Sequence, residues 1–216
     1  MGRPRKKAGV PDARQRIIDS FWLLLQDHHL RDLTVGMIVR QADCNRGTFY
    51  YHFADMDDLI FKAIEGELLG NPKVSMELFN LITGVDVDEN YAKEILGGQR
   101  IQRLSLVIRQ GGTEAVEKAV KTTMTDMWQT VLCPDGGELK PQTQIIIEYT
   151  SSGILGVASY SSRMKEEDKE ASIDLSILKK LASHTLECVA DAQDIPMDEI
   201  LMRLKILNQF SKMQQK

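Results

Sequence analysis

Five polar side chains lie within seven consecutive residues near the amino terminus, and their types suit contact with duplex DNA. They are Arg46, Thr48, Tyr50, Tyr51 and His52. Each can donate a hydrogen bond, and Arg46 also carries a fixed positive charge. Such donors contact phosphate oxygens, while a guanidinium fork or a threonine methyl group can read base edges in the major groove. The segment therefore predicts a surface that binds nucleic acid.

Two short helices are expected to present these side chains. Apolar residues recur before them at the i, i+3, i+4, i+7 spacing of a helix with one buried face, at Val35, Ile38, Val39 and Ala42. Thr34 can cap this helix, and Asp43-Cys44-Asn45 indicates a tight turn, because Asp and Asn tolerate left-handed backbone conformations. Asn45 can then cap a second helix that buries Phe49 and Phe53. Two short helices joined in this way form a helix-turn-helix, whose second helix enters the major groove.

Charge is distributed unevenly along the chain. Residues 1–54 hold 9 Lys or Arg against 5 Asp or Glu, and residues 55–216 hold 18 against 26. A positive amino-terminal part on an acidic body suits a chain that contacts phosphates at one end only.

The first ten residues are expected to form a flexible basic arm. Gly2-Arg-Pro4 is similar to hooks that read the minor groove, where an extended Arg enters a narrow and negative space. The arm residues that would add salt-sensitive affinity are Arg3, Arg5, Lys6 and Lys7. A solvated tail is the alternative interpretation.

The motif as a whole resembles a known family. Gly47-Thr-Phe-Tyr-Tyr-His-Phe53, followed by Asp55 and an apolar helix, resembles the signature of TetR-type transcriptional regulators. The resemblance covers roughly residues 11–69. It departs from the family's pattern at Asp43, where the family usually has Gly, and at Met56, where it often has a phosphate-binding Lys.

The resemblance implies a role for each residue of the motif. The residues that would mainly contact phosphates are Thr34, Tyr50 and His52. The residues that would lie closest to base edges are Arg46, Thr48 and Tyr51. Gly47 would let the backbone approach DNA closely, while Phe49 and Phe53 would hold the helix from beneath.

Breaks in the helical pattern divide the chain into an arm, a head and a body. The fourth helix is expected from Asp55, which can cap it, to about Leu69, and Gly70-Asn-Pro72 ends it. We therefore expect a helix-turn-helix DNA-binding domain at 11–70 and a helical ligand-sensing and dimerisation domain at 71–216. The body helices are expected at about 73–83, 89–96, 99–110, 113–132, 141–164, 173–192 and 197–213. The expected fold class is all-α, with a three-helix head and a larger helical body.

Two of the body helices have the pattern of a dimer interface. Glycine in a helix interior costs about 1 kcal/mol, so small residues at helical spacing indicate close approach by another helix. The residues expected at this interface are Ser152, Gly153, Gly156 and Ser159 in one helix, and Leu175, Leu178, Ala182, Thr185 and Val189 in the other. Paired across a two-fold axis, these helices would form a four-helix bundle. Packing within one subunit is the alternative.

The body is also expected to hold a small, apolar effector, as family members usually do. Methionine adapts to irregular shapes, while Trp and Tyr each add one polar group. The candidates to line the effector pocket are Phe79, Ile101, Leu104, Met124, Met127, Trp128, Ile146 and Tyr149. An ordinary helical core is the alternative for any single one of them.

Several other classes of protein do not fit the sequence. There is no Gly-rich phosphate loop, HExxH or GxSxG motif, so we expect no enzyme and no cofactor. Three widely spaced cysteines without a CxxC pair argue against a disulfide framework or a zinc site, and no metal site is expected. No run of 18 apolar residues and no signal-type apolar core exist, which predicts a cytoplasmic protein.

The sequence thus favours a dimeric regulator that binds double-stranded operator DNA and is a repressor released by a small effector. Three alternatives remain: an activator or regulator that senses a protein partner, a helical interaction module whose head no longer reads DNA, and an enzyme with an unrecognised site. Salt-dependent preference for one DNA fragment over random DNA separates the regulators from the other two classes.

Overall fold

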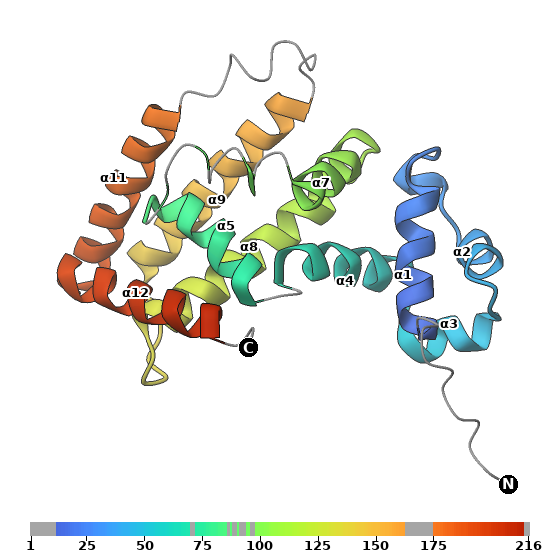
Figure 1. Ribbon diagram of the computed structural model, residues 1–216, viewed down its shortest axis with the longest axis horizontal. Helices are drawn as coiled ribbons and strands as arrows, with labels where there is room; N and C mark the ends of the chain where they lie inside the picture. Colours follow the sequence, from blue (N-terminus) through green and yellow to red (C-terminus); the bar gives the residue numbers. More distant parts are fainter. Residues whose placement is uncertain are drawn as a thin grey trace, which may run out of the picture. The chain divides into compact units, whose positions relative to one another are not determined.

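The computed structural model describes residues 12–69, 72–85, 87, 90, 94–95, 98–162 and 175–213 (Figure 1). All regular structure in these residues is helical, and the expected all-α fold is confirmed. The chain divides into two compact units, Met1–Ala63 and Ile64–Lys216. The basic arm and the expected domain boundary at residues 70 and 71 lie outside the described residues.

The amino-terminal unit is a small bundle of short helices. Its elements are α1 (Ala13–Leu24), the 3-10 turn η1 (Leu30–Asp32), α2 (Val35–Gln41), α3 (Arg46–His52) and the start of α4 (Met56–Leu69). They enclose side chains with no more than 1% of their surface exposed, namely Ile17, Phe21, Leu25, Ile38, Phe49, Phe53 and Leu59. A helix of seven residues is not stable alone, so α2 and α3 depend on this packing.

The helix starts are fixed by the capping residues expected from the sequence. The Thr34 hydroxyl accepts a hydrogen bond from the Met37 N–H at 3.3 Å, and Asn45 Oδ1 accepts one from the Thr48 N–H at 2.8 Å. Asp55 Oδ1 does the same for the Asp58 N–H at 2.8 Å. These bonds satisfy backbone donors that a helix leaves without partners.

The second unit consists of long helices packed around one apolar core. Its described helices after α4 are α5 (Pro72–Thr83), α7 (Gln99–Arg109), α8 (Thr113–Leu132), α9 (Pro141–Ser162), α11 (Leu175–Gln193) and α12 (Met197–Met213). Helix α9 packs against α7, α8 and α11, and α5 packs against α11 and α12. The bounds agree with the expected helices to within a few residues, except that most of the helix expected at 89–96 lies outside the described residues.

Two contacts define the centre of this core. Phe79 of α5 meets Trp128 of α8 edge to face, with ring centroids 5.0 Å apart. Asn80 of α5 and Asn208 of α12 are buried, and each donates its side-chain N–H to the other's amide oxygen, at 2.9 and 3.0 Å. A reciprocal amide pair satisfies both groups in one register only, so it fixes how α12 lies on α5. Ile200 and Leu204 of α12 are fully buried within the subunit, whereas Phe210 further along the helix is 60% exposed.

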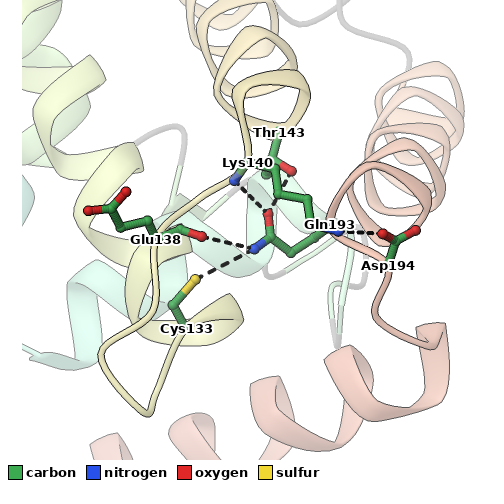
Figure 2. Close-up of polar contacts among 6 residues, drawn as sticks. All are labelled: Cys133, Glu138, Lys140, Thr143, Gln193 and Asp194. Carbon is green, nitrogen blue, oxygen red and sulfur yellow. Dashed lines mark hydrogen bonds and ion pairs between the residues drawn. The ribbon is translucent and has the colours of Figure 1, made fainter.

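Gln193 joins the loop before α9 to the end of α11 (Figure 2). Its side-chain oxygen accepts hydrogen bonds from the Lys140 N–H at 3.0 Å and the Thr143 hydroxyl at 2.8 Å. Its side-chain N–H₂ donates to the Glu138 carbonyl at 3.2 Å and contacts Cys133 Sγ at 3.7 Å. One amide thus serves four groups, of which the Thr143 side chain is fully buried.

Replacing Gln193 by Ala is expected to lower the free energy of unfolding by about 1–3 kcal/mol, because groups that become unsatisfied pay their desolvation cost. Urea denaturation followed by circular dichroism measures this loss. Asp194→Asn is the matched control, since it removes only the exposed ion pair with Lys140 and should change stability by less than about 1 kcal/mol. Equal stability of the two variants would contradict the role given to Gln193.

Candidate nucleic-acid interface

Helix α3 separates a buried aromatic face from an exposed one. Phe49 is fully buried and lies 5.7 Å from Phe53, centroid to centroid, while Tyr50 and Tyr51 are 55% and 84% exposed. Aromatic rings of this size are normally withdrawn from water in a soluble protein, and an exposed pair of them marks a contact surface. The two tyrosines are therefore available to a partner, as the sequence predicts.

Arg46 begins α3 and its side chain is exposed. Its guanidinium extends back toward the start of α2, where a Cβ added at Gly36 would lie 3.7 Å from Nη2. The charge thus lies beside the exposed side chain of Thr34, the cap of α2. The Arg46 guanidinium and the start of α2 therefore lie at the same edge of the helix-turn-helix.

The Asn45 side chain binds the Thr48 hydroxyl and limits the space at Gly47. The Thr48 hydroxyl donates a hydrogen bond to Asn45 Oδ1 at 3.2 Å, which leaves its methyl group as the free part of the side chain. A Cβ added at Gly47 would lie only 3.2 Å from the same oxygen. The glycine thus makes room for the capping contact within the free protein, in addition to any room it leaves for DNA.

His52 ends α3 and is partly exposed. Its ring meets Tyr51 edge to face, with centroids 4.9 Å apart. With Thr34, Arg46, Thr48, Tyr50 and Tyr51, it completes a set of residues that all come from α2, α3 and their caps. The basic-arm residues Arg3 and Arg5 lie outside the described residues.

The turn between α2 and α3 accepts Asp43 where the resembling family usually has Gly. Asp43 has φ +48°, in the left-handed region that Asp tolerates better than most residues. The next residue, Cys44, donates its backbone N–H to the Val39 carbonyl at 3.0 Å. Burial raises the pKa of the Cys44 thiol, which disfavours the reactive thiolate form.

The start of α4 has Met56 where the resembling family often has a lysine, and the nearest lysine in α4 is Lys62. Met56 is partly buried, and Lys62 lies 2.9 Å from Asp58 Oδ2 in an ion pair. The Ala54 N–H and Lys62 both donate to Asp58, which holds the pKa of that carboxyl below its usual value. Lys62 thus forms an ion pair within the head.

The candidates for the effector pocket fall into two groups. Four of them are buried in the body, namely Phe79, Leu104, Met124 and Trp128, and three are partly exposed, namely Ile101, Met127 and Ile146. Tyr149 is 80% exposed on α9 and does not point into the core. A buried polar residue that the sequence analysis missed is Ser151, whose hydroxyl is buried and has no hydrogen-bond partner among the residues that the structure describes. Its position on the core face of α9 could have indicated it.

The candidates for the dimer interface are also divided. Ser152, Gly153 and Gly156 are exposed on α9, and a Cβ added at either glycine would meet no atom within 4 Å. Ser159, Leu178 and Thr185 are partly exposed. The side chain of Leu175 is outside the part of the structure that is described. Ala182 and Val189 are 5% and 0% exposed, so they pack inside their own subunit and cannot reach a partner.

Apolar side chains other than the expected interface residues are exposed on α9 and α11. The large apolar side chains that the sequence analysis missed there are Ile145, Val157, Ile177 and Leu181, all at least 43% exposed. On α9, Ile145, Tyr149, Ser152, Gly156 and Tyr160 follow one another at i, i+4, i+7, i+11 and i+15, which places them on one side of the helix. The same periodicity was readable from the sequence.

No described helix is long and apolar enough to cross a membrane. Within the described part of one chain, no group of three or more His, Cys, Asp or Glu side chains could hold a metal ion.

The two units define a class of protein. A helix-turn-helix head with an exposed aromatic reading helix is followed in the chain by a helical body. Residues 17–63 match the family model for bacterial regulatory proteins of the tetR family. No curated protein matches the chain. The match confirms the resemblance seen in the sequence. The amino-terminal domain is a DNA-binding domain of the TetR type, and the chain is a DNA-binding transcriptional regulator.

Proposed function

We propose that this regulator binds a pseudo-palindromic operator as a homodimer and acts as a repressor that a small apolar effector releases. The observation that carries DNA reading is the exposure of Tyr50 and Tyr51 on a helix whose opposite side is held by fully buried Phe49. A fixed scaffold and an exposed polar and aromatic face are the requirements of a recognition helix.

Dimerisation is supported by the exposed stripe of α9 from Ile145 to Tyr160. Apolar side chains at helical spacing on the side away from the core cost free energy in water and favour burial against a partner. The open space around Gly153 and Gly156 leaves room for another helix at that point. Ile177 and Leu181 extend the apolar surface onto α11, which packs beside α9.

A two-fold axis through α9 and α11 would form a four-helix bundle and would present two copies of α3. Reading helices enter successive major grooves when their separation is near one turn of DNA, about 34–36 Å, or a multiple of it. The operator is therefore expected to consist of two related half-sites.

Effector sensing is supported by the core of the body and its connection to α4. The buried Ser151 hydroxyl has no hydrogen-bond partner within the described part of the chain, so it offers a polar contact to a ligand that enters beside α9. Glu67 of α4 forms an ion pair with Arg103 of α7, and Arg100 donates to the Glu67 carbonyl at 3.2 Å. A ligand that moves α7 would thereby move α4, which continues into the head.

Enrichment of random duplexes on the purified protein tests the proposal. The expected result is one inverted repeat, bound as one dimer per duplex, with an affinity that falls steeply as salt rises. Binding that is equal on all sequences, or absent at low salt, would exclude operator recognition. Effector release predicts reciprocity, so DNA should weaken effector binding by the factor by which effector weakens DNA binding.

Arg46→Ala is expected to relax sequence preference, because a guanidinium fork to guanine is worth about 1–3 kcal/mol against the wrong base. His52→Ala should instead weaken binding to all sequences alike, because it removes a phosphate contact. Titration of both variants against operator and random duplexes separates the two roles. If Arg46→Ala lost as much affinity for random DNA as for operator, its base-reading role would be excluded.

A further inference from the structure

Three side chains of α11 form a cluster that DNA reading does not use. Cys188 Sγ lies 3.8 Å from His184 Nε2, and His184 Nδ1 lies 3.5 Å from Glu187 Oε2. All three belong to consecutive turns of one helix, and His184 and Cys188 are four residues apart. Residues at this spacing lie one above the other on a helix.

The distances within the cluster are compatible with two metal ligands and a carboxylate that orients one of them. A carboxylate beside one imidazole nitrogen favours the tautomer in which the other nitrogen keeps its lone pair, and such carboxylates commonly orient histidine ligands. Here the lone pair would belong to Nε2, which faces the thiol. In a tetrahedral site with Zn–S of about 2.3 Å and Zn–N of about 2.0–2.1 Å, the two donors are about 3.5–3.6 Å apart. The observed 3.8 Å needs only a small side-chain adjustment.

The pair lies on the exposed apolar stripe of α11. Ile177, Leu181, His184 and Cys188 follow at i, i+4, i+7 and i+11, whereas Ala182 and Val189 point into the core. His184 stands midway between the two ends of α11, Leu175 and Gln193. When two copies of a helix cross on a two-fold axis, the residues at the crossing meet their own counterparts. A crossing at the middle of α11 would bring two His–Cys pairs together.

We propose that two copies of this pair bind one divalent, thiophilic metal ion of the zinc type at the subunit interface. This inference rests on the homodimer of the proposed function. One chain supplies two donors and cannot close a tetrahedral site by itself. Two chains supply two thiolates and two imidazoles, a combination that binds zinc in four-coordinate sites.

Metal binding would make dimerisation of the protein depend on the concentration of the ion. An ion that binds only the dimer stabilises the dimer by mass action. DNA binding, which needs both reading helices, would then be strengthened by the metal.

Cobalt titration of the full-length, metal-free protein tests the proposal, since tetrahedral Co²⁺ with thiolate ligands has intense visible and near-ultraviolet absorption. The expected end point is one Co²⁺ per two chains, displaced by Zn²⁺. Cys188→Ser should abolish the thiolate-to-cobalt band, and Glu187→Gln should weaken metal affinity about 10–100-fold. Cys188→His should still bind Zn²⁺ but without that band, and Cys133→Ser is the control that should leave it unchanged.

Sedimentation of the same samples, with and without metal, separates this inference from the proposed dimer. A dimer that binds no Co²⁺ at micromolar concentration overturns the metal site and leaves the dimer standing. A monomer under both conditions overturns both proposals, and a monomer that dimerises on adding Zn²⁺ supports both. One ion per chain, or loss of the band in Cys133→Ser, would assign the ion to another place and overturn the inference.

Discussion

Phe49→Ala is expected to unfold the DNA-binding head and abolish operator binding. Phe49 is fully buried, and it contacts Phe53 and Tyr50 at centroid distances of 5.7 and 5.4 Å. Truncating a buried phenylalanine costs about 3–5 kcal/mol through lost transfer free energy and the cavity left behind. This is a large part of the 5–15 kcal/mol that typically stabilises a whole protein. Because α3 has seven residues, it cannot keep its helical form without this contact.

Urea denaturation and binding to the enriched operator measure the two consequences of Phe49→Ala. Tyr50→Ala is the matched control, since Tyr50 is the next residue but is half exposed. The control should leave the free energy of unfolding within about 1 kcal/mol and weaken binding to all DNA alike. Wild-type stability of Phe49→Ala would mean that α3 is held in place by other residues.

Gly156→Glu is expected to convert the dimer to monomers and to reduce operator affinity about 10²–10⁴-fold, because simultaneous contact with two half-sites is lost. A Cβ at Gly156 meets no atom within 4 Å, so the subunit itself accommodates the change. Replacing a glycine within a helix even gains up to about 1 kcal/mol of helix propensity. The charge would instead be buried at the proposed interface, where it has no partner.

Gly66→Glu is the matched control for this variant. Gly66 lies within α4, a Cβ there also meets no atom within 4 Å, and the change of charge is the same. Analytical ultracentrifugation should find the control dimeric and Gly156→Glu monomeric, each with helical content at least equal to wild type. A dimeric Gly156→Glu protein would remove α9 from the interface.

The reading head could be predicted in detail from the sequence because its signals are local. Thr34, Asn45 and Asp55 cap the helices that follow them, and the apolar period of α2 and α3 correctly identifies the buried Ile38 and Phe49. Each cap bonds to a backbone N–H only three residues further on, and each of these short helices has a single apolar face that can be buried. The exposure of Tyr50 and Tyr51 follows from the burial of Phe49.

The positions of the body helices could be predicted from the sequence, but not which face of each helix is buried. Helix α11 carries two apolar stripes, one through Ala182 and Val189 and the other through Ile177 and Leu181. Both have helical periodicity, and the sequence analysis assigned the first to a partner, whereas the fold buries it within the subunit. Tyr149 is a similar case, because an aromatic residue near core positions turned out to be 80% exposed.

The sequence by itself determined the helical class, the positions of most helices and the residues that form the recognition helix, since periodicity and caps act over only a few residues. Only the tertiary structure decided which stripe of each long helix meets its own core. It also decided that His184, Cys188 and Glu187 lie in contact on an outer face. The physical reason is that a long helix with more than one apolar stripe can pack in several ways, and the neighbouring helices select one of them.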